Sequence, residues 1–396
     1  MMFKEKYQKV APEHRLLKKK IIFIMPHLPT VDFQRKYFVN QLKENNFILE
    51  YWDVGPILGY DMKFISDLTD VNYTKIICLK ELKLRLKYEN HADAVFVLQL
   101  TRNLQSLSIY SLFRLYNKRT VFFGRGYLPC VSQPKTIGYY LNKVYRGGKN
   151  LSSIIYATIF RFLPVIKKYD LVFAAGTLAE RLHLNDAIKI SKIHHFDVDH
   201  STDKNVENNF IADCCVFIDD FMPFHPDFSL GSSDTINADN YYNSLNNFFD
   251  TVEKKLGKTI IIAAHPKATY KNNPFNKRTI VFGDTNSLVK NSVFVFTHAS
   301  TAIAYAVIYE KPLCLIFSDE IKSVHFDIYN LMIMTSKILD CPILNFEKNS
   351  SFDLADCTVD KKKYEDYYVE FLSNEANTRL SSEIVIDEIN NLFRTG

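Results

Sequence analysis

Three groups of polar residues each follow an apolar run that is typical of a buried strand. They are Asp219-Asp220, His265-Pro266-Lys267 and Thr297-His298-Ala299-Ser300-Thr301. In a parallel sheet the carboxyl ends of neighbouring strands face one crevice, and ligands bind in that crevice. An acid, an imidazole and two hydroxyls gathered there could move a proton and hold an anionic group.

The third group predicts an anion site. Ser300 and Thr301 would lie where a strand turns into a helix, and the first N–H groups of a helix have no partner within it. The helix dipole adds partial positive charge at this end, which suits a phosphate. We therefore expect Ser300 and Thr301 to hold a phosphate, and we place Thr297 and His298 with them on the donor-binding side. The alternative is an ordinary helix cap without a ligand.

His265 could hydrogen-bond a departing phosphate or protonate it, because imidazole titrates near neutral pH. Pro266 would restrict the backbone that aims the ring, and we place Pro266 and Lys267 on the donor side with it. The alternative is a histidine that is satisfied at the end of a strand.

The adjacent acids Asp219 and Asp220 would point in opposite directions from an extended chain. One of them could face the crevice and act as a general base toward a hydroxyl, provided that burial raises its pKa. The sequence does not decide which one, and a solvated turn with two exposed acids is the alternative.

Two further motifs carry weaker signals. Arg125 lies between two glycines after another apolar run and could pair with an anionic acceptor or with a donor carboxylate, although an ordinary loop would look the same. The segment 193–200 holds three histidines and an Asp-x-Asp pair. Carboxylates of this kind can bind a metal, but the histidine spacing does not fit zinc. We expect a structural or cleft-lining role there and no metal.

The surrounding pattern alternates short apolar strands with longer helical segments, and it restarts in the second half of the chain. This alternation predicts an α/β protein with two Rossmann-like units, each a parallel sheet covered by helices. The polar stretch 201–209 is the candidate linker. The predicted domains are residues 1–205, 206–375 and a C-terminal helix over 376–396.

The composition of the chain narrows the class of protein to which it can belong. The chain has 396 residues, of which 47% are hydrophobic, so it can form full-sized cores. A net charge of +5 is too weak to indicate nucleic-acid binding. The seven cysteines form no C-x-x-C pair, and no apolar run approaches the about 20 residues that cross a bilayer. We expect a cytoplasmic protein; the lysine runs at 18–20 and 167–168 suggest peripheral contact with an anionic membrane or are simply solvated.

The order of an acidic pair, then His-Pro, then Ser-Thr resembles the signature of bacterial sialyltransferases and capsule-type Kdo transferases with GT-B folds. The resemblance covers about residues 214–320. It implies a donor in which CMP activates a nonulosonic acid. It also implies Asp219 or Asp220 as base, His265 as phosphate contact, and Ser300 and Thr301 as phosphate clamp. Phe221 departs from the pattern, because the family has glycine there.

The function that this resemblance implies is an inverting transfer to a hydroxyl of a bacterial surface glycan, free or lipid-linked. It needs a CMP-sugar as co-substrate and no metal or other cofactor. Three alternatives stay open: a CDP-glycerol or CDP-ribitol phosphotransferase, a GT-B enzyme that uses UDP-sugars, and a glycan-binding protein with a decayed GT-B fold.

Overall fold

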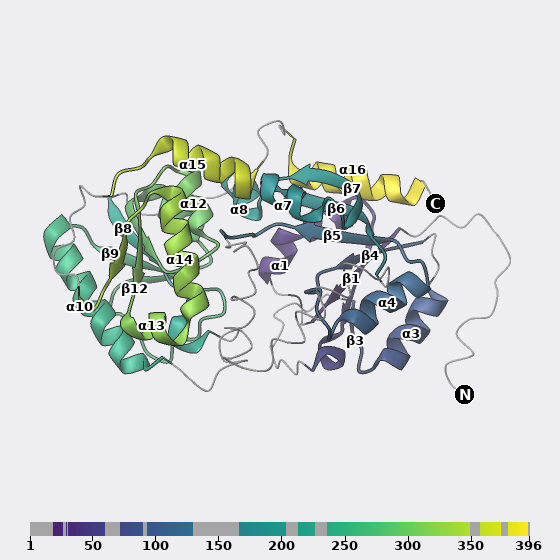
Figure 1. Cartoon of the computed structure of the whole chain (residues 1–396), viewed down its shortest axis with the longest axis horizontal. Coiled ribbons are helices and arrows are strands. Elements are labelled where there is room, and N and C mark those ends of the chain that lie inside the picture. The colour runs from purple at the N-terminus through teal and green to yellow at the C-terminus, as the bar shows by residue number, and fades with distance from the viewer. Residues whose placement is uncertain are drawn as a thin grey trace, which may run out of the picture.

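The chain folds into two α/β lobes (Figure 1), each built on one parallel sheet, as the sequence predicts. The computed structural model describes residues 19–26, 29, 31–59, 72–89, 93–129, 166–202, 213–225, 236–348, 357–373 and 379–394. Lys18 and residues 203–209 of the predicted linker lie outside these ranges.

The N-terminal lobe has a seven-stranded sheet in the order β3-β2-β1-β4-β5-β6-β7. Its strands are β1 Lys20–Met25, β2 Ile48–Asp53, β3 Tyr73–Lys75, β4 Ala94–Leu98, β5 Thr120–Gly124, β6 Tyr169–Ala175 and β7 Ala187–Ile193. Its helices are α1 Val31–Lys36, α2 Val39–Glu44, α3 Leu79–Tyr88, α4 Leu107–Leu115, α7 Gly176–His183 and α16 Ser381–Arg394, with a 3-10 turn at Gly55–Leu58.

The C-terminal lobe has a six-stranded sheet in the order β10-β9-β8-β11-β12-β13. Its strands are β8 Cys214–Ile218, β9 Ile260–Ala264, β10 Ile280–Phe282, β11 Ser292–Thr297, β12 Leu313–Phe317 and β13 Ile343–Asn345. Its helices are α8 Phe196–Ser201, α10 Ala238–Leu256, α11 Thr285–Asn291, α12 Ile303–Ile308, α13 Asp319–Val324, α14 Phe326–Leu339 and α15 Lys361–Tyr367, with a 3-10 turn at Met222–Phe224 and a π-helical segment at Tyr368–Leu372.

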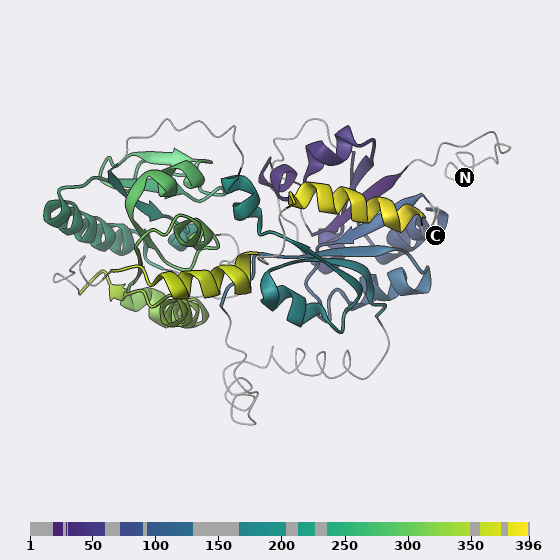
Figure 2. The ribbon, with the colours of Figure 1, turned by 90° about the horizontal axis from the view of Figure 1, so that it is seen from above.

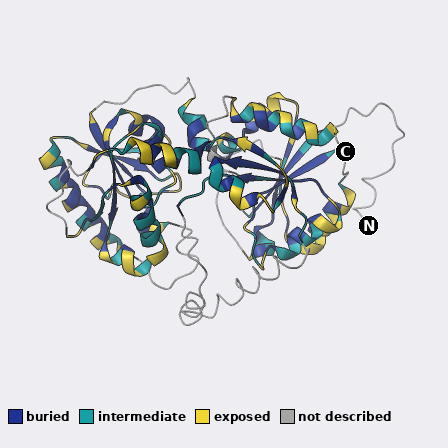
Figure 3. Ribbon diagram, turned by 45° about the horizontal axis from the view of Figure 1, so that its top comes forward, coloured by how far each residue is buried: buried dark blue, intermediate teal, exposed yellow. Residues whose placement is uncertain are grey.

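Central strands are buried on both faces, which is why their sequences are continuous apolar runs. Every residue of β4 and β8 is buried, and Figure 3 shows the dark blue strands inside each lobe with exposed residues on the outer helices. The edge strand β7 instead mixes buried and exposed residues. An apolar run therefore indicates the centre of each sheet but not its edge.

Two predicted helices differ from the structure. The apolar spacing over 31–45 predicts one helix, but the segment forms two short helices, because Phe38 adopts a left-handed conformation with φ 54° and interrupts the hydrogen-bond ladder. The sequence predicts that the helix after β11 covers 300–309, but the helix begins only at Ile303, and a tight turn occupies Ser300–Ala302 before it. The long helix α10 begins at an Asn237 cap and ends at Gly257, whose φ of 61° suits glycine.

The chain crosses between the lobes twice. It leaves the N-terminal lobe after β7, and Val198 of α8 already belongs to the C-terminal core. At the other end α16 returns to the N-terminal lobe, where Figure 2 shows it as the yellow helix. Its residues Ile384, Val385 and Ile389 belong to the N-terminal core. The first crossing lies at His194, earlier than the predicted boundary at 205, because a polar stretch reports exposure rather than a change of lobe.

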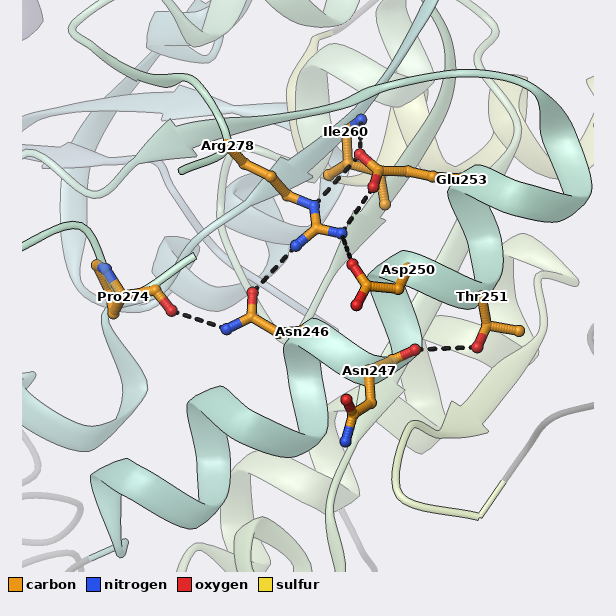
Figure 4. A network of polar contacts seen from close by, with 8 residues as sticks. All are labelled: Asn246, Asn247, Asp250, Thr251, Glu253, Ile260, Pro274 and Arg278. Carbon is orange, nitrogen blue, oxygen red and sulfur yellow. Dashed lines mark hydrogen bonds and ion pairs between the residues drawn. The ribbon is translucent and has the colours of Figure 1, made fainter. Parts of the chain in front are cut away.

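A buried arginine fixes the segment between β9 and β10 (Figure 4). Arg278 is 9% exposed, and its guanidinium donates to Glu253 at 2.7 Å, to Asp250 at 2.5 Å and to Asn246 at 3.1 Å, all from α10. Glu253 also accepts the backbone N–H of Ile260 at the start of β9. The network therefore anchors the segment that follows His265.

We expect Arg278→Met to lower the free energy of unfolding by about 2–3 kcal/mol. Removing one partner of a buried charge network leaves the others uncompensated, although the partly exposed carboxylates here can regain water. Urea unfolding measures the change. The control is Lys362→Met, which removes an exposed pair with Asp366 and should change stability by at most about 0.5 kcal/mol. Equal losses in the two variants would contradict the anchoring role.

Candidate active site

A cavity of about 350 Å³ lies between the lobes at the carboxyl ends of β8, β9 and β11. In the sheet, β8 and β11 are neighbours at the point where the strand order reverses, which is where open α/β sheets bind ligands. Of the predicted site residues, six line this cavity: Asp219, Asp220, His265, Pro266, Ser300 and Thr301. The remaining four, Lys267, Thr297, His298 and Arg125, are not among the lining residues.

Asp219 is the more deeply buried of the two acids, with 1% of its surface exposed. The Tyr270 hydroxyl donates to its Oδ2, whereas its Oδ1 accepts no hydrogen bond of normal geometry from the described residues. Burial raises the pKa of Asp219 to about 7, and the charge of Asp220 adds to this rise. The hydrogen bond from Tyr270 and the nearby N–H of Phe221 oppose it. A carboxyl in this state can accept a proton near neutral pH.

Asp220 joins the ends of β8 and β11. Its Oδ2 accepts the backbone N–H of Ala299 at 3.0 Å, and the Ser300 hydroxyl bonds the same carboxylate. Burial raises its pKa to about 6, and these two bonds oppose the rise. Asp220 thus occupies an N–H group of the loop that the sequence analysis assigned to phosphate.

Phe221 takes the conformation that glycine adopts easily, with φ 52° and ψ 38°. The family to which the sequence bears a resemblance has glycine at this position, so the departure lies in the side chain rather than in the backbone shape. The Phe221 ring is buried and packs edge-on against Tyr270, with ring centroids 5.4 Å apart. Phe221 therefore supports the tyrosine that holds Asp219.

His265 stands at the end of β9, and its Nδ1 accepts the backbone N–H of Lys267 at 3.1 Å. The neutral ring must therefore carry its proton on Nε2, as a hydrogen-bond donor. The ring of His225, which also lines the cavity, lies edge-on to it at 4.8 Å. Pro266 and Lys267 are exposed, so Lys267 contributes a backbone group that orients the imidazole.

The Ser300–Ala302 turn presents two hydroxyl residues to the cavity. The Ala302 N–H donates to Ser300 Oγ at 3.3 Å, and Thr301 is exposed. Because α12 has six residues and starts after this turn, the helix dipole adds little here. Any anion binding by this turn would depend on its hydroxyls and its N–H groups.

Thr297 and His298 were predicted to bind the donor, but the structure does not bring them to the cavity. Both side chains are completely buried. The Thr297 hydroxyl donates to the Ile218 carbonyl at 3.1 Å, between β11 and β8. His298 lies between the Ile316 carbonyl and the Tyr241 hydroxyl, and burial lowers its pKa to about 4. It is therefore a neutral histidine that fixes the strand ends beneath the site.

Arg125 also differs from its prediction as an acceptor-side residue. Its side chain is 4% exposed, and its Nη1 lies 3.7 Å from Asp199. The guanidinium packs over Phe38 and Phe123, with ring centroids 5.1 and 5.2 Å away. Arg125 therefore belongs to the interior of the N-terminal lobe, where it braces the crossing to α8.

The histidine-rich segment 193–200 contributes some residues to the crossing between the lobes and others to the cavity wall. The His194 N–H donates to Ser381 at 2.9 Å, and its ring contacts Ser373. His194 therefore connects the two segments in which the chain passes between the lobes. His195 is buried, which lowers its pKa to about 3. Asp197 and His200 line the cavity. Among the described residues, no three His, Cys, Asp or Glu side chains gather as metal ligands would.

Several cavity residues come from outside the three motifs and were not predicted from the sequence. They include Arg35 and Lys36 of α1, Tyr305 of α12, and Thr285 and Asn286 of α11. Tyr270, which bonds Asp219, was missed as well. The adjacent basic residues at 35–36 were a visible signal, but nothing nearby in the sequence indicated that they face the C-terminal lobe.

No helix in the described part of the chain has the length and apolar character that a membrane span requires. No protein-family model matches the chain, and no curated protein matches it by sequence.

Solved structures match over nearly the whole chain. A variant of the wall teichoic acid polymerase TagF with CDPG has a TM-score of 0.52 and 14% identity, covering 96% of this chain and 90% of that one. The calicheamicin glycosyltransferase CalG4 has a TM-score of 0.52 and 10% identity, covering 96% and 99%. The UDP-GlcNAc 2-epimerase of Methanocaldococcus jannaschii has a TM-score of 0.46 and 12% identity, covering 94% and 99%.

At these identities the likeness concerns the fold. The resemblance to sialyltransferases and Kdo transferases, which is more specific, stays a prediction. The two parallel sheets and the likeness to TagF and CalG4 show that this chain has a GT-B fold.

Proposed function

We propose that this chain is a glycosyltransferase that moves a nonulosonic acid from its CMP donor to a hydroxyl of a glycan or lipid-linked glycan. The observation that carries the proposal is the convergence of Asp219, His265 and the Ser300–Ala302 turn on one cavity between the lobes. These groups follow three different strands, so their meeting is a property of the fold rather than of one local motif.

The donor phosphate would bind to the Ser300 and Thr301 hydroxyls and to His265. Charge builds on that phosphate as the bond from the anomeric carbon to the phosphate oxygen breaks, and CMP leaves with the electron pair. The Nε2–H of a neutral His265 could donate to the phosphate as this charge develops. Preorganised donors of this kind are catalytic because they bind the transition state more strongly than the ground state.

Asp219 is our candidate for the base. The acceptor oxygen attacks the anomeric carbon from the face opposite CMP, which inverts the configuration, and its proton passes to Asp219. A carboxylate whose pKa is raised to about 7 is well matched to this task. Asp220 is less suited to it, because Ala299 and Ser300 already bond its carboxylate, and we propose that it positions the phosphate-binding turn.

A second candidate is transfer of a glycerol phosphate from CDP-glycerol. It is favoured by the structural likeness to a wall teichoic acid polymerase that was studied with CDPG. In that reaction the acceptor oxygen would attack phosphorus instead of carbon, and CMP would leave in both cases. The same three groups could serve either reaction, so the donor decides between the candidates.

We expect CMP to stabilise the chain against heat more than UDP or GDP does. A ligand at 100 times its dissociation constant raises the free energy of unfolding by about 2.7 kcal/mol. The effect should fall in the double variant Ser300→Ala, Thr301→Ala. It should persist in Ser323→Ala, which removes an exposed hydroxyl elsewhere. Differential scanning fluorimetry measures these shifts.

Turnover then separates the candidates. Release of CMP from CMP-N-acetylneuraminate in the presence of an acceptor supports the first proposal. Release of CMP from CDP-glycerol supports the second candidate, and release of UDP from a UDP-sugar contradicts both. Nucleotide binding without turnover on any of these donors would indicate a glycan-binding protein.

A further inference from the structure

Helix α3 presents an exposed face that consists only of lysines and large apolar residues. We call it the α3 face, and its exposed residues are Leu79, Lys80, Lys83, Leu84, Lys87 and Tyr88. Leu84 is 48% exposed and Tyr88 is 58% exposed, whereas Leu82 and Leu86 on the other side of the helix are completely buried. Single exposed apolar residues are common on protein surfaces, but apolar residues gathered on one helix face indicate an interaction surface.

The positive charge of the α3 face has no exposed carboxylate beside it on the helix. Glu81, the one acidic residue of α3, is half-buried, and its Oε1 lies 3.1 Å from Nη2 of Arg85. Its Oε2 accepts the Ile77 N–H just before the helix. Helix α4, which packs beside α3 (Figure 1), contains no acidic residue and ends in the exposed pair Arg114 and Leu115. The face is therefore complementary to a negatively charged partner.

The lysine runs from which the sequence suggested membrane contact differ from the α3 face in this respect. Lys20 pairs with Glu89 at 2.8 Å, and Lys167 pairs with Asp170 at 2.8 Å. The three lysines of the α3 face form no ion pair with any residue in the described part of the chain. Their charge is therefore available to an external anion.

We propose that the α3 face docks on an anionic lipid bilayer, with its lysines at the lipid phosphates and with Leu84 and Tyr88 in the interfacial layer. A lysine can keep its ammonium among the headgroups while its stem and the neighbouring apolar side chains lie deeper. Tyrosine favours the same interface. The Lys87 ammonium lies 5.6 Å from the centre of the Tyr88 ring, so charge and ring can reach the bilayer together.

A bilayer fits this composition better than a protein partner does. The cores of protein interfaces are depleted in lysine. An anionic membrane surface, in contrast, attracts each lysine that comes near it. The inference goes beyond the proposed function, because no nucleotide takes part in docking. It would place the enzyme at the surface where a lipid-linked acceptor is found.

Co-sedimentation of the full chain with sucrose-loaded vesicles measures docking. The wild-type chain should bind vesicles of phosphatidylcholine with about 30% phosphatidylglycerol, and it should not bind phosphatidylcholine alone. About 0.5 M NaCl should release it, because salt screens exposed charges. The triple variant Lys80→Gln, Lys83→Gln, Lys87→Gln should partition at least about tenfold more weakly. Leu84→Gln should partition about threefold more weakly, because a polar amide replaces a leucine that enters the interface.

A matched control removes the same number of charges from another helix. The variant Lys361→Gln, Lys362→Gln, Lys363→Gln changes three exposed lysines of α15 in the C-terminal lobe. Its partitioning should stay within about twofold of wild type. Because every exchanged residue is exposed, all variants should melt at nearly the wild-type temperature.

Three results would overturn the inference. They are a wild-type chain that does not bind the phosphatidylglycerol vesicles, equal losses in the two triple variants, and unchanged binding in the α3 variant. The last result would mean that the face serves another partner. Unchanged binding of Leu84→Gln would overturn the insertion of its side chain. The α3 triple variant should bind CMP within about twofold of wild type, so failure of docking and failure of the proposed function are separate results.

Discussion

Replacing His265 with alanine should lower kcat by about 10²- to 10³-fold and leave the affinity for CMP within a few fold. The imidazole would act mainly on the charge that develops as the nucleotide leaves, so its loss should affect the transition state more than the ground state. The bond from the Lys267 N–H to Nδ1 leaves the proton of the neutral ring on Nε2, where it can be donated to a ligand. Steady-state kinetics together with CMP titration measures the two quantities.

Two variants give this result a specific meaning. His265→Gln retains an amide donor near the position of Nε2, so partial recovery would indicate hydrogen-bond stabilisation rather than proton transfer. Lys267→Ala keeps the backbone N–H that orients the ring while removing an exposed ammonium, and it should retain turnover within about twofold. If His265→Ala turns over at the wild-type rate while nucleotide still binds, the catalytic assignment is wrong.

The sequence predicts the site best where polar residues of the site directly follow a central strand. The continuous apolar runs at 20–25 and 214–218 predict strands and coincide with β1 and β8, and the groups after β8, β9 and β11 do meet at one cavity. Burial on both faces makes such strands continuous apolar runs, so their ends can be read from composition alone.

The direction in which an individual side chain points is harder to predict from the sequence than the position of a strand end. Thr297 and His298 belong to a correctly located motif, yet both are buried, because Thr297 bonds the neighbouring strand at Ile218 and His298 bonds Ile316 and Tyr241 beneath the site. The start of α12 was also predicted too early, since a hydroxyl-rich turn and a helix start have similar composition.

Residues that reach the site through tertiary structure could not be predicted. Arg35 and Lys36 come from the other lobe, and their position depends on how the two sheets face each other. Tyr270 lies in the segment between β9 and β10, which Arg278 anchors to α10 through side chains that no local pattern connects. The crossing at His194 depends in the same way on Ser373 and Ser381, nearly two hundred residues later in the chain.

Asp219→Asn should lower kcat by about 10²- to 10⁴-fold, because an asparagine cannot take the acceptor proton. In the wild-type chain the base must be ionised, so kcat/KM should rise with pH through about 7 and then level off. The Asp219→Asn variant should lose this rise of kcat/KM at acidic pH, which is the acidic limb of the pH profile. Tyr270→Phe should keep the limb but move it to higher pH, because the tyrosine hydroxyl stabilises the ionised carboxylate.

Asp220→Asn is the matched control for this assignment. The new side chain keeps an oxygen that can accept the Ala299 N–H, so the turn should retain its shape and the acidic limb should persist. If Asp220→Asn abolishes the limb and Asp219→Asn preserves it, the two roles are reversed.

The burial that makes Asp219 a base near neutral pH also makes it unfavourable for folding. Its pKa is about 7 in the folded chain and about 3.9 in an unfolded one, so between these values the folded state binds more protons. The free energy of unfolding therefore falls as pH rises from about 4 to 7. An amide at this position cannot ionise, so Asp219→Asn should melt a few degrees above the wild-type chain at about pH 8, and the two should converge below about pH 4. A catalytically dead variant that is more stable only at higher pH would mark Asp219 as a buried functional acid, whereas equal melting at both pH values would mean that its carboxyl is solvated and ordinary.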